Sequence, residues 1–118
     1  MRRGPIRRKS RPENDRVTPS LWLYVISRDG GCMAPILDRE AGPCRNKWGV
    51  VVARNNESAL TVQHVWLDYS VKGDRAPSDK EHLLCLCWGH HLGGWATRKD
   101  SLALQRAHLI RLAAEDRA

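Results

Sequence analysis

The sequence of 118 residues predicts one small domain of the α+β class. Three observations predict this class. Helix-start and helix-stop patterns bound the segments 18–28 and 100–114, near the two ends of the chain. Short apolar runs that are typical of strands lie between them, at 50–53, 59–66 and 82–87. Loops rich in glycine and proline join these runs, and the chain has no internal repeat.

The first helix is predicted from its capping residues. A Thr-Pro-Ser sequence begins at Thr18 and places proline in the first turn, where its missing N–H is tolerated. The apolar run 21–26 follows, and Gly30-Gly31 supplies the stop. The next segment, residues 30–49, contains many glycines and prolines and is predicted to be a loop.

The middle of the chain is predicted to form strands because apolar and polar residues alternate there. A turn at 55–58 separates the strand 50–53 from the strand 59–66, and a polar loop at 68–80 leads to the strand 82–87. In the second strand, alternation places Leu60, Val62, His64 and Trp66 on one side and Thr61, Gln63 and Val65 on the other.

The last part of the chain is predicted to be helical. A short helix is expected from Gly89, and a longer one from Asp100 or Ser101, either of which can cap it. Leu102, Leu109, Ile110 and Leu112 are the residues of this longer helix that we expect to be buried. His108 has no visible partner and is predicted to lie on the surface.

The charge of the chain points to nucleic acid as a partner. The net charge is +7, and residues 1–16 hold seven basic residues against Glu13 and Asp15, which accounts for +5. Because this segment has little apolar content, we expect a disordered basic arm at 1–16 and one domain at 17–118. The arm would contact phosphates in a salt-sensitive way, or else serve only to keep the protein soluble.

The four cysteines favour a metal site over disulfides. No apolar segment in the basic N-terminus resembles a signal peptide, and the run 21–26 is too short to cross a membrane. These features predict a cytoplasmic protein with reduced thiols. Cysteines in such proteins bind metals more often than they form disulfides, although buried free thiols and disulfides are the alternatives.

The spacing of cysteines and histidines predicts a structural zinc ion. Cys87 and His90 form a chelating pair, and Cys32 and Cys44, with eleven residues between them, form the second pair. Cys85 is excluded because it lies two residues from Cys87 on the same face of a strand, about 6.6 Å away. Two sulfurs on one zinc must lie within roughly 4 Å of each other. Cys85 is therefore predicted to be a core residue.

Several segments together resemble a known family of nucleases. They are Leu60–Val65, His82–His91, Arg28–Cys32 and Gly94–Thr97. In these segments the chain resembles the HNH endonucleases, or ββα-metal (His-Me finger) nucleases, in particular the small free-standing HNH proteins of tailed phages that infect actinobacteria. The resemblance covers residues 28–99 and implies a zinc-stapled ββα-metal core with flanking helices.

The resemblance assigns positions to the histidines. His64 stands at the first histidine of the motif, His82 at its asparagine, and His91 at its last histidine, while His90 replaces the second cysteine of the knuckle. It therefore implies a metal-dependent DNA endonuclease or nickase with His64, His82 and His91 as its catalytic residues.

The roles implied by the resemblance suit the chemistry of phosphodiester hydrolysis. His64 would be the general base, and His91 with Gln63 would hold a divalent ion such as Mg²⁺. Arg98 and Lys99 would contact neighbouring phosphates, although an ordinary basic helix end is an equal alternative. The implied partners are DNA and a phage terminase, in the cytoplasm of the host cell, for a monomeric protein that takes part in phage DNA processing.

Two departures from the motif keep alternatives open. Gln63 stands where the family commonly has aspartate, and His82 stands where it has asparagine. A zinc-dependent DNA-binding module that has lost catalysis is therefore the main alternative. A ribonuclease or toxin on the same scaffold is a further one.

Overall fold

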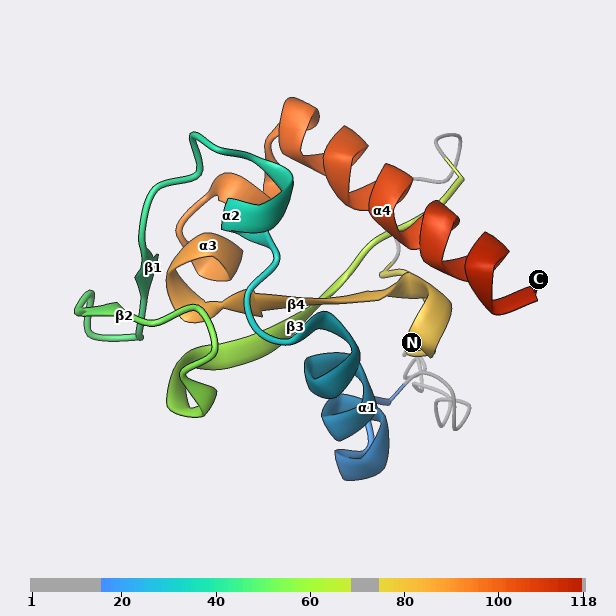
Figure 1. The fold of residues 1–118 in the computed structure, drawn as a ribbon, viewed down its shortest axis with the longest axis horizontal. Coiled ribbons are helices and arrows are strands. Elements are labelled where there is room, and N and C mark those ends of the chain that lie inside the picture. Colours follow the sequence, from blue (N-terminus) through green and yellow to red (C-terminus); the bar gives the residue numbers. More distant parts are fainter. Residues whose placement is uncertain (1–15, 69–74, 118) are drawn as a thin grey trace, which may run out of the picture.

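The computed structural model describes residues 16–68 and 75–117. The order of elements confirms the α+β class, with two small antiparallel sheets. In Figure 1 the β3–β4 hairpin crosses the centre, with α1 below it and α4 above. The β1–β2 hairpin and α3 lie together at one end. Of the predicted basic arm, residues 1–16, only Arg16 is among the described residues.

The central sheet is a hairpin of two five-residue strands. β3 (Leu60–His64) pairs antiparallel with β4 (Leu83–Cys87), so that Leu60 faces Cys87 and His64 faces Leu83. Every residue of β4 is buried, because helices cover both faces of this apolar strand. Two of the three predicted strands therefore form this hairpin, each slightly shorter than expected.

The outer edge of β4 is covered by α1 and the turn that follows it. The Asp29 carboxylate accepts a hydrogen bond from the Cys85 backbone N–H (2.9 Å), and Met33 N–H donates to the Cys85 carbonyl (2.9 Å). The Arg28 guanidinium donates to the Leu83 carbonyl (2.7 Å). These contacts satisfy backbone groups that a two-stranded sheet would otherwise leave open.

The first helix, α1 (Pro19–Asp29), confirms the prediction from capping residues. The Thr18 hydroxyl accepts a hydrogen bond from Leu21 N–H (3.2 Å), and Gly30 ends the helix at a φ of 72°. Val25 and Ile26 are buried against the central hairpin. The predicted cap, proline and glycine stop thus all act where expected.

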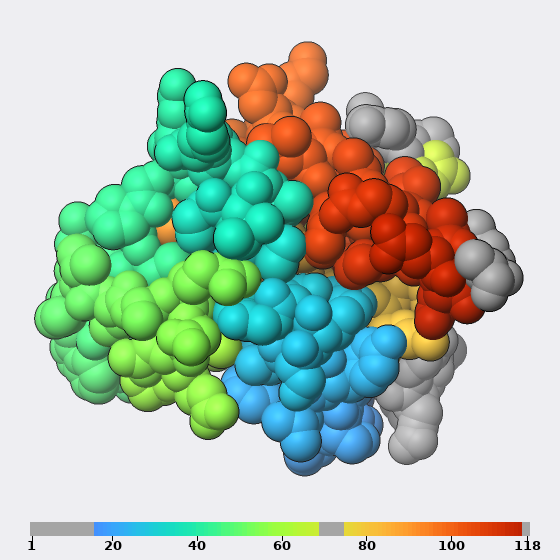
Figure 2. All heavy atoms as spheres, in the orientation of Figure 1, coloured from blue at the N-terminus to red at the C-terminus, as the bar shows by residue number. Residues whose placement is uncertain are grey.

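The segment predicted as a loop contains two short elements. The helix α2 (Ala34–Leu37) packs beside α4, where the two helices form one continuous surface in Figure 2. Further along, β1 (Cys44–Arg45) pairs with β2 (Val51–Val52), with Cys44 opposite Val52. The predicted strand 50–53 is present, but its two-residue partner was not foreseen.

The last two helices follow β4 directly. The short α3 (Trp88–Leu92) begins where β4 ends, and α4 (Lys99–Arg117) is longer than predicted. Two predictions for α4 are wrong: His108 is buried, and Ile110 is 49% exposed. The reason is that the buried stripe of α4 carries polar residues at helical spacing, so apolar residues alone misplace it. The buried positions are Ser101, Gln105, His108 and Leu109.

Within residues 16–68 and 75–117, none of the helices has the length and apolar character needed to cross a membrane.

Candidate functional site

Three cysteines and one histidine meet at the end of the central hairpin. Cys32 lies in the turn after α1, Cys44 in β1, Cys87 at the end of β4 and His90 in α3. All four side chains are buried, and their ligand atoms lie within 4.8 Å of one another. These are the four residues that the sequence predicted as metal ligands, and they are placed to hold a metal ion such as zinc.

The distances within this Cys₃His cluster suit a tetrahedral site. His90 Nδ1 lies 3.4 Å from the Cys32 sulfur, 3.9 Å from the Cys44 sulfur and 3.2 Å from the Cys87 sulfur. A zinc ion with bonds of about 2.3 Å to sulfur and about 2.0 Å to nitrogen would separate such atoms by roughly 3.6 Å. The cluster therefore needs only small adjustments to coordinate zinc.

The orientation of the His90 ring also fits a ligand role. Nε2 lies 3.0 Å from the carbonyl oxygen of Ala41, which can only accept, so Nε2 carries the proton and donates. Nδ1 then holds the lone pair and points toward the three sulfurs. A carbonyl acceptor behind a metal-binding histidine is the usual means of fixing its tautomer.

The thiols of the cluster differ in their acidity. A hydrogen bond from Cys32, and one from His90 when both of its ring nitrogens carry protons, lower the pKa of Cys87 to about 3, against the effect of burial. The hydrogen bond with Cys87 raises the pKa of His90 in turn, so the neutral His90 ring that can bind a metal is favoured only when a cation replaces this proton. The hydrogen bond between Cys32 and Cys87, together with burial, raises the pKa of Cys32, and burial raises that of Cys44 to about 11. Without a cation the cluster therefore favours a single thiolate, on Cys87. A divalent ion would allow all three sulfurs to ionise.

The fourth cysteine stands apart from this cluster. Cys85 is fully buried, and burial raises the pKa of its thiol to about 12, so it stays protonated in the core. None of the four cysteines forms a disulfide. The prediction that Cys85 is a core residue is confirmed.

The residue after His90 faces a different partner. His91 Nδ1 lies 2.8 Å from the Thr61 hydroxyl, which donates its only proton to the Leu86 carbonyl (2.7 Å). The hydroxyl must therefore accept from His91, and His91 Nε2 is left with the lone pair. Burial lowers the pKa of His91, which favours the neutral imidazole that can bind a metal ion.

His64 is the last residue of β3 and is only partly buried. Its Nε2 lies 2.9 Å from the hydroxyl oxygen of Ser78, which the sequence did not single out. Because successive side chains of a strand alternate, His64 points away from the side on which Thr61 contacts α3. The structure thus places the side chains of His64 and His91 on opposite sides of β3.

His82 lies in a 3-10 turn, Lys80–His82, directly before β4. The prediction that it begins the strand is wrong by one residue, because Asp79 caps this turn. The Asp79 carboxylate is 2.7 Å from His82 Nδ1 and also accepts from His82 N–H. The His82 ring meets the ring of Trp66 edge to face, with centroids 5.9 Å apart.

Gln63 is buried and its amide is engaged in the core. Its Nε2 donates to the Ala96 carbonyl (3.2 Å) and to the side-chain oxygen of Gln105 (3.4 Å). Gln105 is fully buried on α4 and also donates to Ala96. The sequence missed this contact, since it joins residues 42 positions apart.

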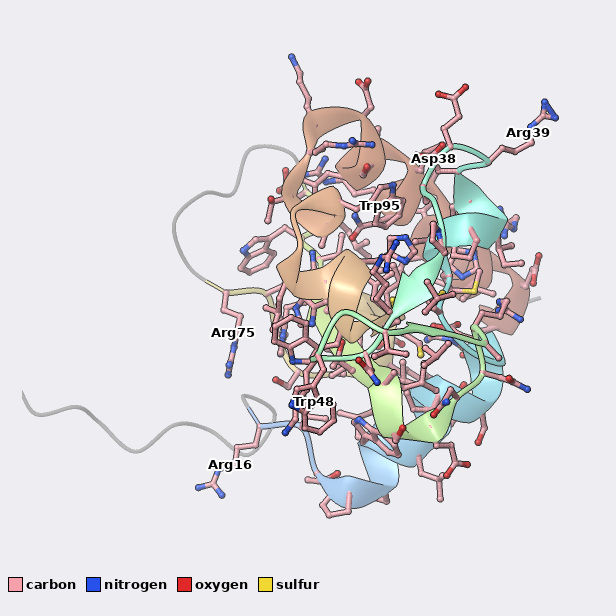
Figure 3. The ribbon with its side chains drawn as sticks, turned by 90° about the vertical axis from the view of Figure 1, so that its left-hand side faces the viewer. Arg16, Asp38, Arg39, Trp48, Arg75 and Trp95 are labelled. Carbon is pink, nitrogen blue, oxygen red and sulfur yellow. The ribbon has the colours of Figure 1, made fainter. Side chains whose placement is uncertain are left out.

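Arg98 and Lys99 stand at the start of α4, and both are exposed. The nearest carboxylate to Arg98 is that of Asp38, at 3.9 Å. Asp38 also accepts a hydrogen bond from the Trp95 indole N–H (2.9 Å), and Figure 3 shows this pair on the face that carries α3. Trp95 is itself buried.

The predicted catalytic residues His64, His82 and His91, unlike the four residues of the Cys₃His cluster, do not form a compact group of metal-binding side chains. Within the described residues, no second group of three or more cysteine, histidine or carboxylate side chains gathers in this way.

Comparisons of the chain with protein-family models, with curated proteins and with solved structures found no match.

Proposed function

We propose that this protein is a metal-dependent DNA endonuclease or nickase of the HNH type, built on a zinc-stapled ββα-metal core. The observation that supports the proposal is the order of the elements β3, β4 and α3, which surround the Cys₃His cluster. His64 ends the first strand, Cys87 ends the second, and His90 and His91 follow on the helix. Because His90 belongs to the cluster, a bound zinc would fix α3 and so position His91 next to β3.

The proposed roles of the catalytic residues are those that the resemblance to HNH endonucleases implies. His64 would accept the proton of the attacking water as general base. His91, with its Nε2 lone pair available, would bind a divalent ion such as Mg²⁺ together with Gln63, and that ion would supply charge neutralisation at the scissile phosphate. His82 would orient the neighbouring groups, and Arg98 and Lys99 would contact adjacent phosphates. Phage DNA processing beside a terminase, in the host cytoplasm, is the corresponding biological setting.

One observation favours a second candidate, a zinc-dependent DNA-binding module without catalysis. The amide nitrogen of Gln63 is committed to Ala96 and Gln105, and no carboxylate joins His91 in a described metal-binding group. A second ion would then depend on His91 and on phosphate and water oxygens, which bind divalent ions weakly without a protein carboxylate.

A plasmid-nicking assay separates the two candidates. Supercoiled plasmid is incubated with the protein and Mg²⁺ or Mn²⁺, and the open-circular product is measured. We expect the wild type and the surface control Arg39→Ala to nick, while His64→Ala binds the plasmid and leaves it intact. If wild type binds DNA but leaves it supercoiled with every divalent ion, the binding module is the correct function. An RNA substrate in parallel tests for a ribonuclease.

A further inference from the structure

A groove with a volume of about 530 Å³ separates the β1–β2 hairpin from the segment that runs from α3 to the start of α4. We call it the hairpin groove. Figure 3 looks onto this face, with Trp48 below and Trp95 above. His90 is among the residues that line it, whereas Gln63, His64, His82 and His91 are not. The hairpin groove is therefore a different surface from the proposed catalytic residues.

The charged side chains that line the hairpin groove are all basic. Arg45 and Lys47 come from the hairpin, and Arg98 comes from the opposite wall. No carboxylate is among the described residues that line it. Arg98 remains 61% exposed despite the neighbouring Asp38 at 3.9 Å, so its guanidinium can still reach a ligand. Three cations with a single carboxylate nearby, that of Asp38, favour a partner with closely spaced negative charges.

Exposed aromatic rings stand beside these cations. Trp48, at the tip of the hairpin, is 75% exposed, and the Lys47 ammonium lies 4.7 Å from the centre of its ring. Trp88 lines the hairpin groove and is also exposed. Flat aromatic surfaces next to basic side chains are the combination that binds unpaired nucleic-acid strands, because the bases stack while the phosphates pair with cations.

The wall formed by α3 is bare backbone where it meets the hairpin. Gly89 and Gly93 both line the hairpin groove. A Cβ on Gly89 would lie 3.0 Å from the Cβ of Arg45, and one on Gly93 would lie 2.2 Å from the Gly89 carbonyl oxygen. The absence of a side chain at Gly89 therefore lets the hairpin pack closely against α3, which fixes this wall of the hairpin groove.

Hydrogen bonds hold the hairpin tip in one shape. The side-chain oxygen of Asn46 accepts from Trp48 N–H (2.9 Å) and from Val50 N–H (3.0 Å). The Arg45 guanidinium donates to the Gly49 carbonyl (2.8 Å). Trp48 is thus presented on an ordered turn, so that little conformational freedom is lost when it binds a partner.

We infer that the hairpin groove binds one unpaired strand of a nucleic acid. Arg45, Lys47 and Arg98 pair with its phosphates, and a base stacks on Trp48 or Trp88. The inference rests on the proposed function for the choice of DNA over RNA, and it deepens that function by naming a second contact outside the catalytic residues. A strand held there would run along the face beside the Cys₃His cluster.

Fluorescence anisotropy with labelled oligonucleotides tests the inference. All variants are made in a His64→Ala background, so that the probe is not cut, and single-stranded DNA, duplex DNA and single-stranded RNA are compared. We expect Lys47→Glu and Trp48→Ala each to weaken binding of single-stranded DNA about tenfold. The matched control Arg39→Glu introduces the same charge change as Lys47→Glu on an exposed residue outside the hairpin groove, and it should bind like the parent protein. Zinc content verifies that every variant is folded.

The salt dependence gives a second readout. Lys47→Ala should make the slope of log affinity against log salt less steep by about 0.7, the value for one phosphate contact to a single strand. The inference is overturned if the slope changes only with duplex DNA. It is also overturned if single-stranded DNA binds with equal affinity to the Lys47→Glu, Trp48→Ala and Arg39→Glu proteins. A protein that binds through the hairpin groove but never nicks plasmid would instead overturn the proposed nuclease and leave the hairpin groove standing.

Discussion

His90 and His91 are adjacent on α3, yet their rings present different nitrogens to their surroundings. His90 donates from Nε2 to Ala41 and keeps Nδ1 for the sulfur cluster. His91 donates from Nδ1 to Thr61 and keeps Nε2. Because neighbouring side chains on a helix diverge by about 100°, two adjacent histidines can serve two separate sites. The backbone carbonyl and the threonine determine which nitrogen each site receives.

Replacement of Cys87 should remove both metal and fold. We expect wild-type protein washed with EDTA to retain about one zinc, and Cys87→Ser to lose it together with its ordered structure, because the bound zinc supplies folding free energy. Elemental analysis and circular dichroism measure the two effects. Cys85→Ala is the matched control, since it removes a buried sulfur that lies outside the cluster, and it should keep its zinc. A Cys87→Ser protein that is folded without metal would contradict the zinc assignment.

Loss of the Thr61 hydroxyl should affect His91 without affecting the zinc. In Thr61→Val the imidazole is no longer fixed in the tautomer that leaves Nε2 available. We expect plasmid nicking to fall by about 10–100-fold, as is typical when a residue that orients a metal ligand is lost. Thr97→Val removes an exposed hydroxyl near the same helix and should nick like wild type. Equal nicking by the two variants would show that Thr61 does not position His91.

Asp29 should make the stability of the protein sensitive to acid. Burial alone would raise the pKa of Asp29, but His108 and Arg28, whose Nε is 2.8 Å away, lower it below the usual value of 3.8. The ionised carboxylate therefore stabilises the fold above pH 3.8, and this contribution is lost as the pH falls through the lower value of the folded state. We expect Asp29→Asn to reduce the free energy of unfolding at neutral pH by about 1–3 kcal/mol.

Urea denaturation at a series of pH values checks this prediction. The difference between wild type and Asp29→Asn should shrink as the pH falls below about 4, where the carboxylate becomes protonated in the unfolded state first. Asp116→Asn is the control, because Asp116 also pairs with a basic residue, Lys80, but lies on the surface. It should leave the free energy of unfolding unchanged. If the difference in the free energy of unfolding were constant across the pH range, the effect of Asp29→Asn would come from altered packing of the side chain and not from the loss of its charge.

Gly31 should tolerate no side chain, because it lies against the backbone of the turn at Arg54, between β2 and β3. Its φ is 137°, and a Cβ would lie 2.5 Å from the carbonyl oxygen of Arg54. Gly42 also has a positive φ, 85°, but has open space around it. We expect Gly42→Ala to lower the free energy of unfolding by about 1–2 kcal/mol and Gly31→Ala by clearly more. Chemical denaturation at saturating zinc measures both, and similar losses would contradict the steric argument.

The predictions that succeeded rest on strong local signals. Thr18, Pro19 and Gly30 bound α1 because capping depends on a few neighbouring residues. The Cys₃His cluster was also predictable, even though eleven residues separate Cys32 from Cys44, because few side chains can complete a tetrahedral site with the Cys87–His90 pair. The small number of cysteine and histidine side chains available as ligands thus made the site predictable despite the unusual spacing.

The predictions that failed depend on contacts between distant parts of the chain. His108 is buried on α4 because its ring faces Asp29, at the end of α1, at 3.8 Å. Gln105 is buried because it meets Gln63 from β3. Taken alone, these polar residues indicate an exposed helix face, so no reading of α4 by itself could reveal which side packs inward. The hairpin groove was missed for the same reason, since its walls come from two separate segments.

The tight contact between the hairpin and α3 has a thermodynamic consequence. Cys44, a member of the cluster, is followed directly by Arg45, which lines the hairpin groove, and His90 belongs to both. A zinc ion that draws Cys44 and His90 together also sets the width of the hairpin groove. If the hairpin groove binds a strand as inferred, zinc and that strand are linked ligands of one protein, and each must change the affinity for the other by the same factor.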